Sequence, residues 1–302
     1  MADRGVTISD PNSPATGTQA KFGAYLALTK PRIIELLLIT TVPAMVLAAR
    51  GWPGTWLLAA TLIGGTLSAG GANAINNYVD RDIDRLMRRT SRRPLARGAV
   101  DPASALRFGI ALGVAGFAWL WLTTNLLAAS ISTAALLFYV FVYTLVLKRT
   151  TPQNIVIGGA AGAAPALVGW AAVTGSLSPS AWILFAVVFY WTPPHFWALS
   201  LKYKDDYAAA GIPMLPVVAG VKRTTRQILA YTSIVGLVSL ALVPVADLGW
   251  FYLLSATGLG LGFVFEAMRV ARAPERAMRL FTYSNLYLAL LFAALWIDVA
   301  IG

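Results

Sequence analysis

Nine apolar stretches, each about 20 residues long, take up most of this 302-residue chain. An α-helix needs roughly 20 apolar residues to cross about 30 Å of hydrocarbon. We therefore expect nine transmembrane helices, at residues 31–49, 54–78, 104–123, 126–147, 153–174, 179–201, 225–246, 248–270 and 280–301. The alternating pattern of a β-barrel is absent. The sequence thus predicts an all-α, polytopic membrane protein.

Composition supports this class and excludes others. Hydrophobic residues make up 58% of the chain and charged residues only 12%, whereas soluble domains carry about 25% charged residues. The chain has no cysteine, which excludes a disulfide scaffold, thiolate nucleophiles and iron–sulfur clusters. A single histidine excludes a multi-histidine metal centre.

The basic residues predict an orientation. If the N-terminus is cytoplasmic, the predicted inside segments hold every one of the 24 Lys and Arg residues except Arg50. This asymmetry places the C-terminus outside. The net charge of +11 then faces the cytoplasm and the anionic lipid leaflet, so we expect the bilayer, and no nucleic acid, as its partner. Of the 13 acids, only Asp247 and Asp298 lie outside, so the chemistry is expected at the cytoplasmic mouth.

The N-terminal segment indicates which cellular membrane contains the protein. Residues 1–20 are polar, contain Asp3 and Asp10, and lack an apolar run. They resemble neither a signal peptide nor an Arg-rich mitochondrial presequence. We therefore expect a disordered cytoplasmic tail at 1–20, one transmembrane domain at 21–302, and a bacterial plasma membrane.

A first polar cluster follows the second predicted helix. If that helix continues past the membrane, five polar residues recur at steps of three and four and share one face: Asn73, Asn76, Asn77, Asp80 and Asp84. Mg²⁺ prefers one or two carboxylates together with water and phosphate oxygens, and Asp80, Asp84 and Asn76 are the candidate ligands. Arg89 and Arg93, further along, could bind the same phosphates. The alternative is a salt-bridged helix end exposed to solvent.

A second cluster follows the sixth predicted helix in the same way. Lys202, Asp205 and Asp206 could complete a metal and diphosphate site, or they could belong to an ordinary charged loop. Lys148 and Arg149, at the end of the fourth helix, are further candidate phosphate contacts.

The only histidine, His195, lies in the sixth helix between aromatic residues that include Trp191 and Trp197. An ionisable residue within a membrane helix is by default a candidate functional residue. His195 could bind haem iron or act as a base, and the rings could surround a flat apolar substrate. The alternative is an interfacial aromatic belt with a histidine that bonds to a neighbouring backbone.

These residues resemble the UbiA superfamily of intramembrane prenyltransferases. The segment from Asn76 to Asp84 is close to the first aspartate-rich motif of that superfamily, with Asn77 where an aspartate is usual. Other segments are more similar to one narrower family, the protohaem IX farnesyltransferases: Lys30–Leu37, Asp80–Leu95, Leu147–Thr150, Trp191–Trp197 and Asp206–Pro216. One departure is Lys202, which stands where the second motif often has an acid.

The resemblance implies a UbiA-type helical bundle that transfers a farnesyl group from farnesyl diphosphate to a vinyl group of haem B, with Mg²⁺ as cofactor. It implies catalytic roles for Asp80, Asp84, His195 and Lys202, and a membrane enzyme that receives the product. Two alternatives remain at this point. One is a prenyltransferase acting on a quinone or chlorophyll precursor, and the other is a transporter of an anionic or porphyrin ligand.

Overall fold

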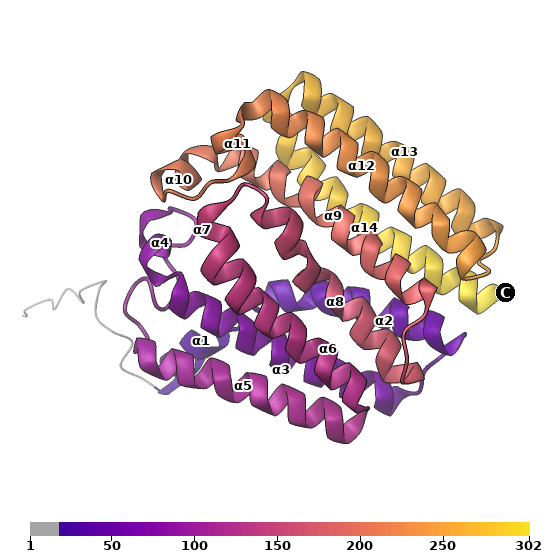
Figure 1. Cartoon of the computed structure of the whole chain (residues 1–302), viewed down its shortest axis with the longest axis horizontal. Coiled ribbons are helices and arrows are strands. Elements are labelled where there is room, and N and C mark those ends of the chain that lie inside the picture. The colour runs from indigo at the N-terminus through magenta and orange to yellow at the C-terminus, as the bar shows by residue number, and fades with distance from the viewer. Residues whose placement is uncertain (1–17) are drawn as a thin grey trace, which may run out of the picture.

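The computed structural model describes residues 18–302, with the side chains of 21–31 and 39–302. Every regular element in this part of the chain is helical (Figure 1). The long helices are α2 (Pro31–Ala49), α3 (Thr55–Val79), α5 (Pro102–Thr123), α6 (Leu126–Leu137) with its continuations η1 (Phe138–Leu147) and α7 (Lys148–Thr150), α8 (Asn154–Thr174), α9 (Pro179–Lys202), α12 (Gly220–Val245), α13 (Trp250–Arg272) and α14 (Ala277–Ile301). The short ones are α1 (Thr18–Leu28), α4 (Arg81–Leu86), α10 (Lys204–Ala209), α11 (Leu215–Val218) and η2 (Pro274–Arg276).

The all-helical prediction is confirmed for the described residues, and the long helices lie close to the predicted ranges. Seven of the described helices are long and apolar enough to cross a membrane. α2 and α9 are not among these seven, and Pro193, Pro194 and His195 lower the hydropathy of α9. The number of nine spans therefore stays a prediction. Of the predicted tail, residues 1–17 lie outside the described residues, and residues 18–20 already belong to α1.

Packing divides the long helices into two groups. α3, α5 and α6 pack side by side, while α9 contacts α8, α12 and α14, and α13 lies against α12 and α14. The largest buried apolar cluster belongs mainly to the second group and includes Trp197, Tyr252, Phe263 and Tyr287. α2 contacts α3 of the first group as well as α8 and α14 of the second, so it connects the two groups.

Close approach of α3 and α5 depends on glycine. A Cβ atom on Gly71 would lie 2.7 Å from the Gly109 carbonyl oxygen, and one on Gly116 would lie 2.8 Å from the Ser68 nitrogen. Small residues allow membrane helices to approach backbone to backbone. The α3–α5 contact is therefore a glycine seam, formed by Gly71, Gly109 and Gly116.

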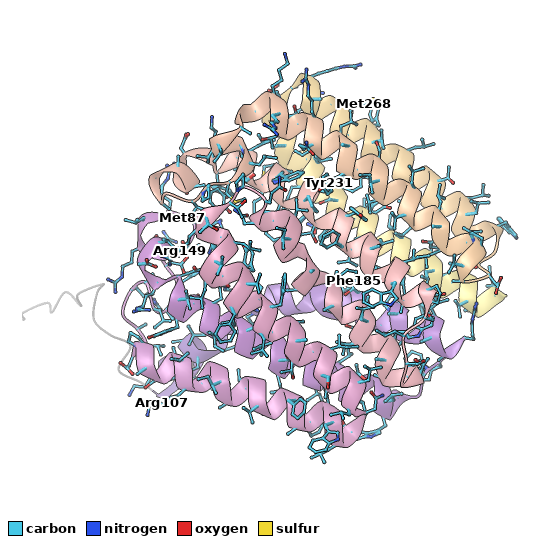
Figure 2. The ribbon with its side chains drawn as sticks, viewed as in Figure 1. Met87, Arg107, Arg149, Phe185, Tyr231 and Met268 are labelled. Atoms are coloured by element: carbon cyan, nitrogen blue, oxygen red, sulfur yellow. The ribbon has the colours of Figure 1, made fainter. Side chains whose placement is uncertain are left out.

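The short helices gather at one end of the bundle. Figure 1 places α4, α7, α10 and α11 together at the left, opposite the C-terminus. An ion pair joins them, because Arg88 Nε lies 3.0 Å from Asp206 Oδ1. A small apolar cluster joins them as well: Ile83, Met87, Ile155, Tyr207, Ile212 and Met214. Met87 and Arg149 lie at this end in Figure 2. The two polar clusters of the sequence thus meet in a cap on the bundle.

The glycine seam gives a stability prediction. Gly71→Ala places its methyl group against the α5 backbone and should lower the free energy of unfolding by about 1–3 kcal/mol, as overpacking does. Gly65→Ala is the matched control in the same helix, since a Cβ there meets no atom within 4 Å. We expect the control to leave stability unchanged or slightly higher. Denaturant titration of the purified variants tests this, and equal stability of the two would contradict the seam.

Candidate active site

The two aspartates of the first cluster are buried at the junction of α3 and α4. α3 ends at Val79, but the helical hydrogen bonds continue from Asp80 N to Asn76 O and from Asp84 N to Asp80 O, both 2.9 Å. Asp80 is 0% exposed and Asp84 is 2% exposed. Both carboxylates are therefore removed from water, and each needs a partner for its charge.

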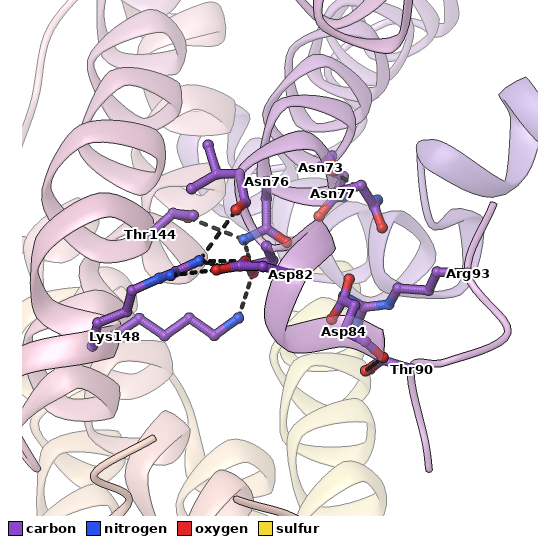
Figure 3. Close-up of polar contacts among 12 residues, drawn as sticks. Asn73, Asn76, Asn77, Asp82, Asp84, Thr90, Arg93, Thr144 and Lys148 are labelled. Carbon is purple, nitrogen blue, oxygen red and sulfur yellow. Dashed lines mark hydrogen bonds and ion pairs between the residues drawn. The ribbon is translucent and has the colours of Figure 1, made fainter. Parts of the chain in front are cut away.

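Asp80 is neutralised from another helix. Lys148 of α7 donates to Asp80 Oδ2, and Asn76 Nδ2 donates to the same oxygen at 2.7 Å. The Arg149 guanidinium is 3.9 Å from Oδ1, but this buried Oδ1 atom accepts no hydrogen bond. Asp80 thus keeps one oxygen without a hydrogen-bond partner, although Asp80, unlike Asp84, is not among the residues that line the cavity described below. Figure 3 shows Lys148 reaching α3 from the facing helix.

Asp84 is neutralised by the loop that follows α4. One guanidinium nitrogen of Arg93 donates to both oxygens of the Asp84 carboxylate, at 2.8 and 2.9 Å. Thr90 Oγ1 donates to the Asp84 carbonyl oxygen at 3.0 Å. The loop is therefore fastened to the aspartate that it neutralises (Figure 3).

The asparagines have different tasks. Asn76 is the centre of the network: its Nδ2 also donates to Thr144 Oγ1 at 3.1 Å. Asn73 and Asn77 donate at 3.0 Å to backbone carbonyls of Thr29 and Leu28. Asn73 lines the cavity described below, but Asn77 does not. These two side chains hold the segment that connects α1 to α2.

That segment carries a cation that the sequence reasoning did not select. Lys30 donates from Nζ to Asn76 Oδ1 at 2.6 Å, and its backbone is left-handed, with φ of 54°. Burial lowers the pKa of Lys30 well below the usual lysine value, and Arg93 and Lys148 lower it further. Among the described side chains, no acid forms an ion pair with Lys30. The only signal in the sequence was its place at the start of the Lys30–Leu37 segment.

A cavity of about 460 Å³ opens beneath the cap. Its cap end is lined by Lys30, Asp84, Arg89, Arg93 and Lys148. Deeper in, α3, α6, α8, α9 and α14 supply mostly apolar and small residues. The cavity therefore has a cationic end and an apolar interior, which suits a ligand with an anionic head and an apolar body.

A π-helical segment shapes one wall. Residues 126–147 were expected to be one ordinary helix, but η1 has i→i+5 hydrogen bonds, a form often found at functional sites. Thr144 Oγ1 bonds to the Tyr139 carbonyl, five residues back, at 2.8 Å. The rings of Tyr139 and Tyr143 stack at 5.3 Å and line the cavity. The Tyr143 ring packs against α8, where a Cβ on Gly158 would be 2.3 Å from the nearest ring atom.

His195 lines the cavity as well. Its ring stacks between Trp191, at 4.3 Å, and Phe281, at 4.4 Å. Its Nδ1 is 2.7 Å from Ser284 Oγ, and Ser284 Oγ in turn donates to the Phe281 carbonyl oxygen at 2.7 Å. Since the hydroxyl has only one proton, Nδ1–H must be the donor to Ser284, and the lone pair of the neutral ring lies on Nε2. No hydrogen bond from the described residues reaches Nε2, so it can serve a ligand.

Other predicted site residues lie outside the cavity lining. Lys202 and Asp205 are exposed, and the Lys202 ammonium lies 5.8 Å from the Tyr203 ring. Asp206 is buried and paired with Arg88. Trp197 is buried against Tyr231. From the second cluster, the residues that reach the cavity are Tyr207, Ile212 and Met214.

Arg149 is also not among the residues that line the cavity. It forms two hydrogen bonds of 2.8 Å with Asp82, and this guanidinium lowers the pKa of the Asp82 carboxyl to about 2. The pair joins α7 to α4 on the outer side of Asp80. Its position indicates support for the site rather than a contact with a ligand in the cavity.

The donor set fits Mg²⁺ only if a ligand helps to bind it. Within the described part of the chain, no group of three or more His, Asp or Glu residues could hold a metal ion. Asp80 and Asp84 supply two carboxylates, and Asp80 Oδ1 is an orphaned oxygen. Mg²⁺ is commonly bound by one or two carboxylates plus water and phosphate oxygens. The residues therefore fit an ion that is completed by a diphosphate.

Comparisons with known proteins agree on the family. The pattern of the UbiA prenyltransferase family matches residues 37–297. A protoheme IX farnesyltransferase of Parafrankia sp. is 60% identical over 90% of this chain and 88% of its own length. The corresponding protein of Frankia alni is 57% identical over 93% of this chain and 99% of its own.

Solved structures show the same fold. A digeranylgeranylglyceryl phosphate synthase superimposes with a TM-score of 0.78, at 18% identity, over 93% of this chain and 99% of its own. A UbiA homologue from Archaeoglobus fulgidus, bound to DMAPP and Mg²⁺, superimposes with a TM-score of 0.64, at 17% identity, over 90% and 98%. With its helical bundle, its buried aspartates and relatives of this identity, the chain belongs to the UbiA prenyltransferase family.

Proposed function

We propose that the protein transfers a farnesyl group from farnesyl diphosphate to a vinyl group of haem B, giving a hydroxyethylfarnesyl haem and diphosphate. Relatives at 60% and 57% identity over most of the chain carry the name protoheme IX farnesyltransferase. The observation that carries the proposal in the structure is the cavity itself. Its cap end carries a cluster of cations with Asp84, and its apolar interior contains a histidine whose Nε2 accepts no hydrogen bond from the described residues.

The cationic end suits the diphosphate. Lys30, Arg89, Arg93 and Lys148 line it, and charge-assisted bonds from such groups would hold the leaving group as its negative charge grows. Asp80 and Asp84, with Asn76 beside them, would hold Mg²⁺ against the diphosphate. When bound, the ion would polarise the diphosphate oxygens and ease departure of the leaving group.

The apolar interior suits the farnesyl chain and the porphyrin. Helices enclose it and limit the water that could capture an allylic cation too early. We propose that His195 holds the haem iron through Nε2, because Ser284 fixes the proton on Nδ1. The vinyl group then attacks the allylic cation. Water captures the new cation next to the porphyrin and loses a proton to the solvent, which leaves the hydroxyl group of the product.

The proposal includes a location. The chain is a multi-pass membrane protein of bacteria. We propose a cytoplasmic N-terminus, an outer C-terminus and an active site at the cytoplasmic face. Lys and Arg are concentrated in the predicted inside segments, and the cap contains both charged clusters. A soluble diphosphate released on that side would leave directly into the cytoplasm.

The deciding experiment supplies the purified protein with haem B, farnesyl diphosphate and Mg²⁺ and measures the mass of the pigment. We expect the mass of haem B plus one farnesyl group and one hydroxyl group. An unchanged pigment, with turnover of a quinone precursor instead, would favour another prenyltransferase activity. Lack of any turnover of farnesyl diphosphate would favour a transporter.

The aspartates give the first test of the site. Asp80→Asn and Asp84→Asn each remove one anionic metal ligand and should abolish farnesyl transfer while the helical content remains. Circular dichroism and product formation are measured together. Near wild-type turnover in either variant at ordinary Mg²⁺ would show that the metal is held elsewhere.

The cations give the second test. Lys148→Ala or Arg93→Ala should weaken the use of farnesyl diphosphate by roughly 10- to 150-fold, since a charged hydrogen bond contributes about 1.5–3 kcal/mol. Lys202→Ala is the comparison, because Lys202 lies outside the cavity lining, and we expect a smaller effect. The measurement is kcat/KM for farnesyl diphosphate, with haem affinity as the control. A change confined to haem affinity would place these cations at the porphyrin.

His195 gives the third test. If its Nε2 binds iron, haem in the wild-type protein should have the optical spectrum of an imidazole complex, and His195→Ala should lose that spectrum together with activity. If His195 acts instead as a base, the two proteins bind haem with the same spectrum and only turnover is lost. Full activity of His195→Ala would exclude both roles.

A further inference from the structure

Cations of the protein itself bind the two aspartates of the site. Lys148 bonds to Asp80 and Arg93 bonds to Asp84, and these are the carboxylates expected to hold the metal. The side chains of Lys148 and Arg93 are 15% and 22% exposed, so the two ion pairs are shielded from the screening that weakens surface pairs. A metal ion that approaches this site meets carboxylates whose charge is already balanced.

From this arrangement we propose that Lys148 and Arg93 are exchangeable counter-ions, which leave the aspartates for the diphosphate when the metal binds. Each cation is paired with an aspartate in this structure and would pair with the diphosphate when the metal takes its place. The proposal rests on the proposed use of a diphosphate donor and goes beyond it, because it makes binding of the metal and binding of the diphosphate interdependent.

The charges of the site require this interdependence. Besides Lys148 and Arg93, the cavity is lined by Lys30 and Arg89, neither of which forms an ion pair with an acid of the described residues. A divalent cation alone would add charge to a group that already has more cations than acids. A diphosphate, which is multiply negative, removes that excess and gives Lys148 and Arg93 new partners.

The ligand count leads to the same conclusion independently. The described part of the chain offers no group of three acids or histidines for a metal. Two carboxylates alone leave most of the coordination of Mg²⁺ to water and substrate. Without diphosphate, a metal ion bound to the protein would therefore lack ligands, and it would also lack carboxylates whose negative charge is not already balanced.

Equilibrium dialysis of Mn²⁺ against the purified full chain tests the exchange. Protein is present on one side only, so complexes of Mn²⁺ with inorganic diphosphate distribute equally and do not contribute. We expect the wild-type protein to bind Mn²⁺ at least about tenfold more tightly with saturating diphosphate than without it. Equal binding in both conditions would overturn the proposal, and this arm needs no variant.

A variant tests which cation is responsible. Lys148→Met frees the Asp80 carboxylate, so it should bind Mn²⁺ without diphosphate about 10- to 100-fold more tightly than the wild type, by the loss of one charged bond. Lys222→Met is the matched control: Lys222 is an exposed lysine at the start of α12, and this variant should behave as the wild type. A folded Lys148→Met protein that binds Mn²⁺ no better than the wild type would also overturn the proposal.

The outcome is separable from the proposed function. A protein that makes farnesylated haem but binds Mn²⁺ independently of diphosphate refutes only the exchange. A protein that couples Mn²⁺ to diphosphate but leaves haem B unchanged refutes only the haem acceptor.

Discussion

Burial of two carboxylates at the end of α3 is the constraint on which the rest of the site depends. An isolated charge in a low-dielectric interior is very unfavourable, whereas a charge with a well-placed partner is tolerated. Asp80 and Asp84 obtain partners from two different places, α7 and the loop after α4. The Lys148–Asp80 pair therefore holds the fourth long helix against the end of α3, and the Arg93–Asp84 pair holds the following loop against α4. Because the charges are also the chemical groups of the site, assembling the fold assembles the active centre.

Much of this could be predicted from the sequence, because membrane helices and their ends follow simple physical rules. Long apolar stretches predicted the positions of the helices, and the spacing of Asn76, Asp80 and Asp84 placed them on one helix face. The nine predicted spans are not confirmed as a number, and for α9 the reason is physical. α9 contains Pro193, Pro194 and His195, of which His195 lines the cavity, and a helix that lines a polar site needs less hydropathy than one surrounded by lipid.

Other features depend on contacts between segments that are distant in the sequence, so no local sequence pattern predicts them. Lys30 enters the site because Asn73 and Asn77 hold the backbone before it, 40 or more residues away in the chain. The π-helical turn in η1 has the composition of any apolar helix, although it directs Thr144 to Asn76. Conversely, Lys202 and Asp205 follow the pattern of a second motif, but the fold directs them to solvent. The sequence of a segment shows which chemical groups it carries, but the packing of the segment decides whether those side chains point to the site or to solvent.

The contact between Tyr143 and Gly158 has a consequence for how such a protein can change over generations. The ring occupies the space that any side chain at position 158 would need, so a larger residue on α8 and an aromatic residue on η1 exclude each other. Replacing Gly158 first would create a clash in the wall of the cavity, and replacing Tyr143 first would leave a space there. We therefore expect the two positions to vary together, and the size of the residue at 158 to record whether a relative retains an aromatic wall at this point.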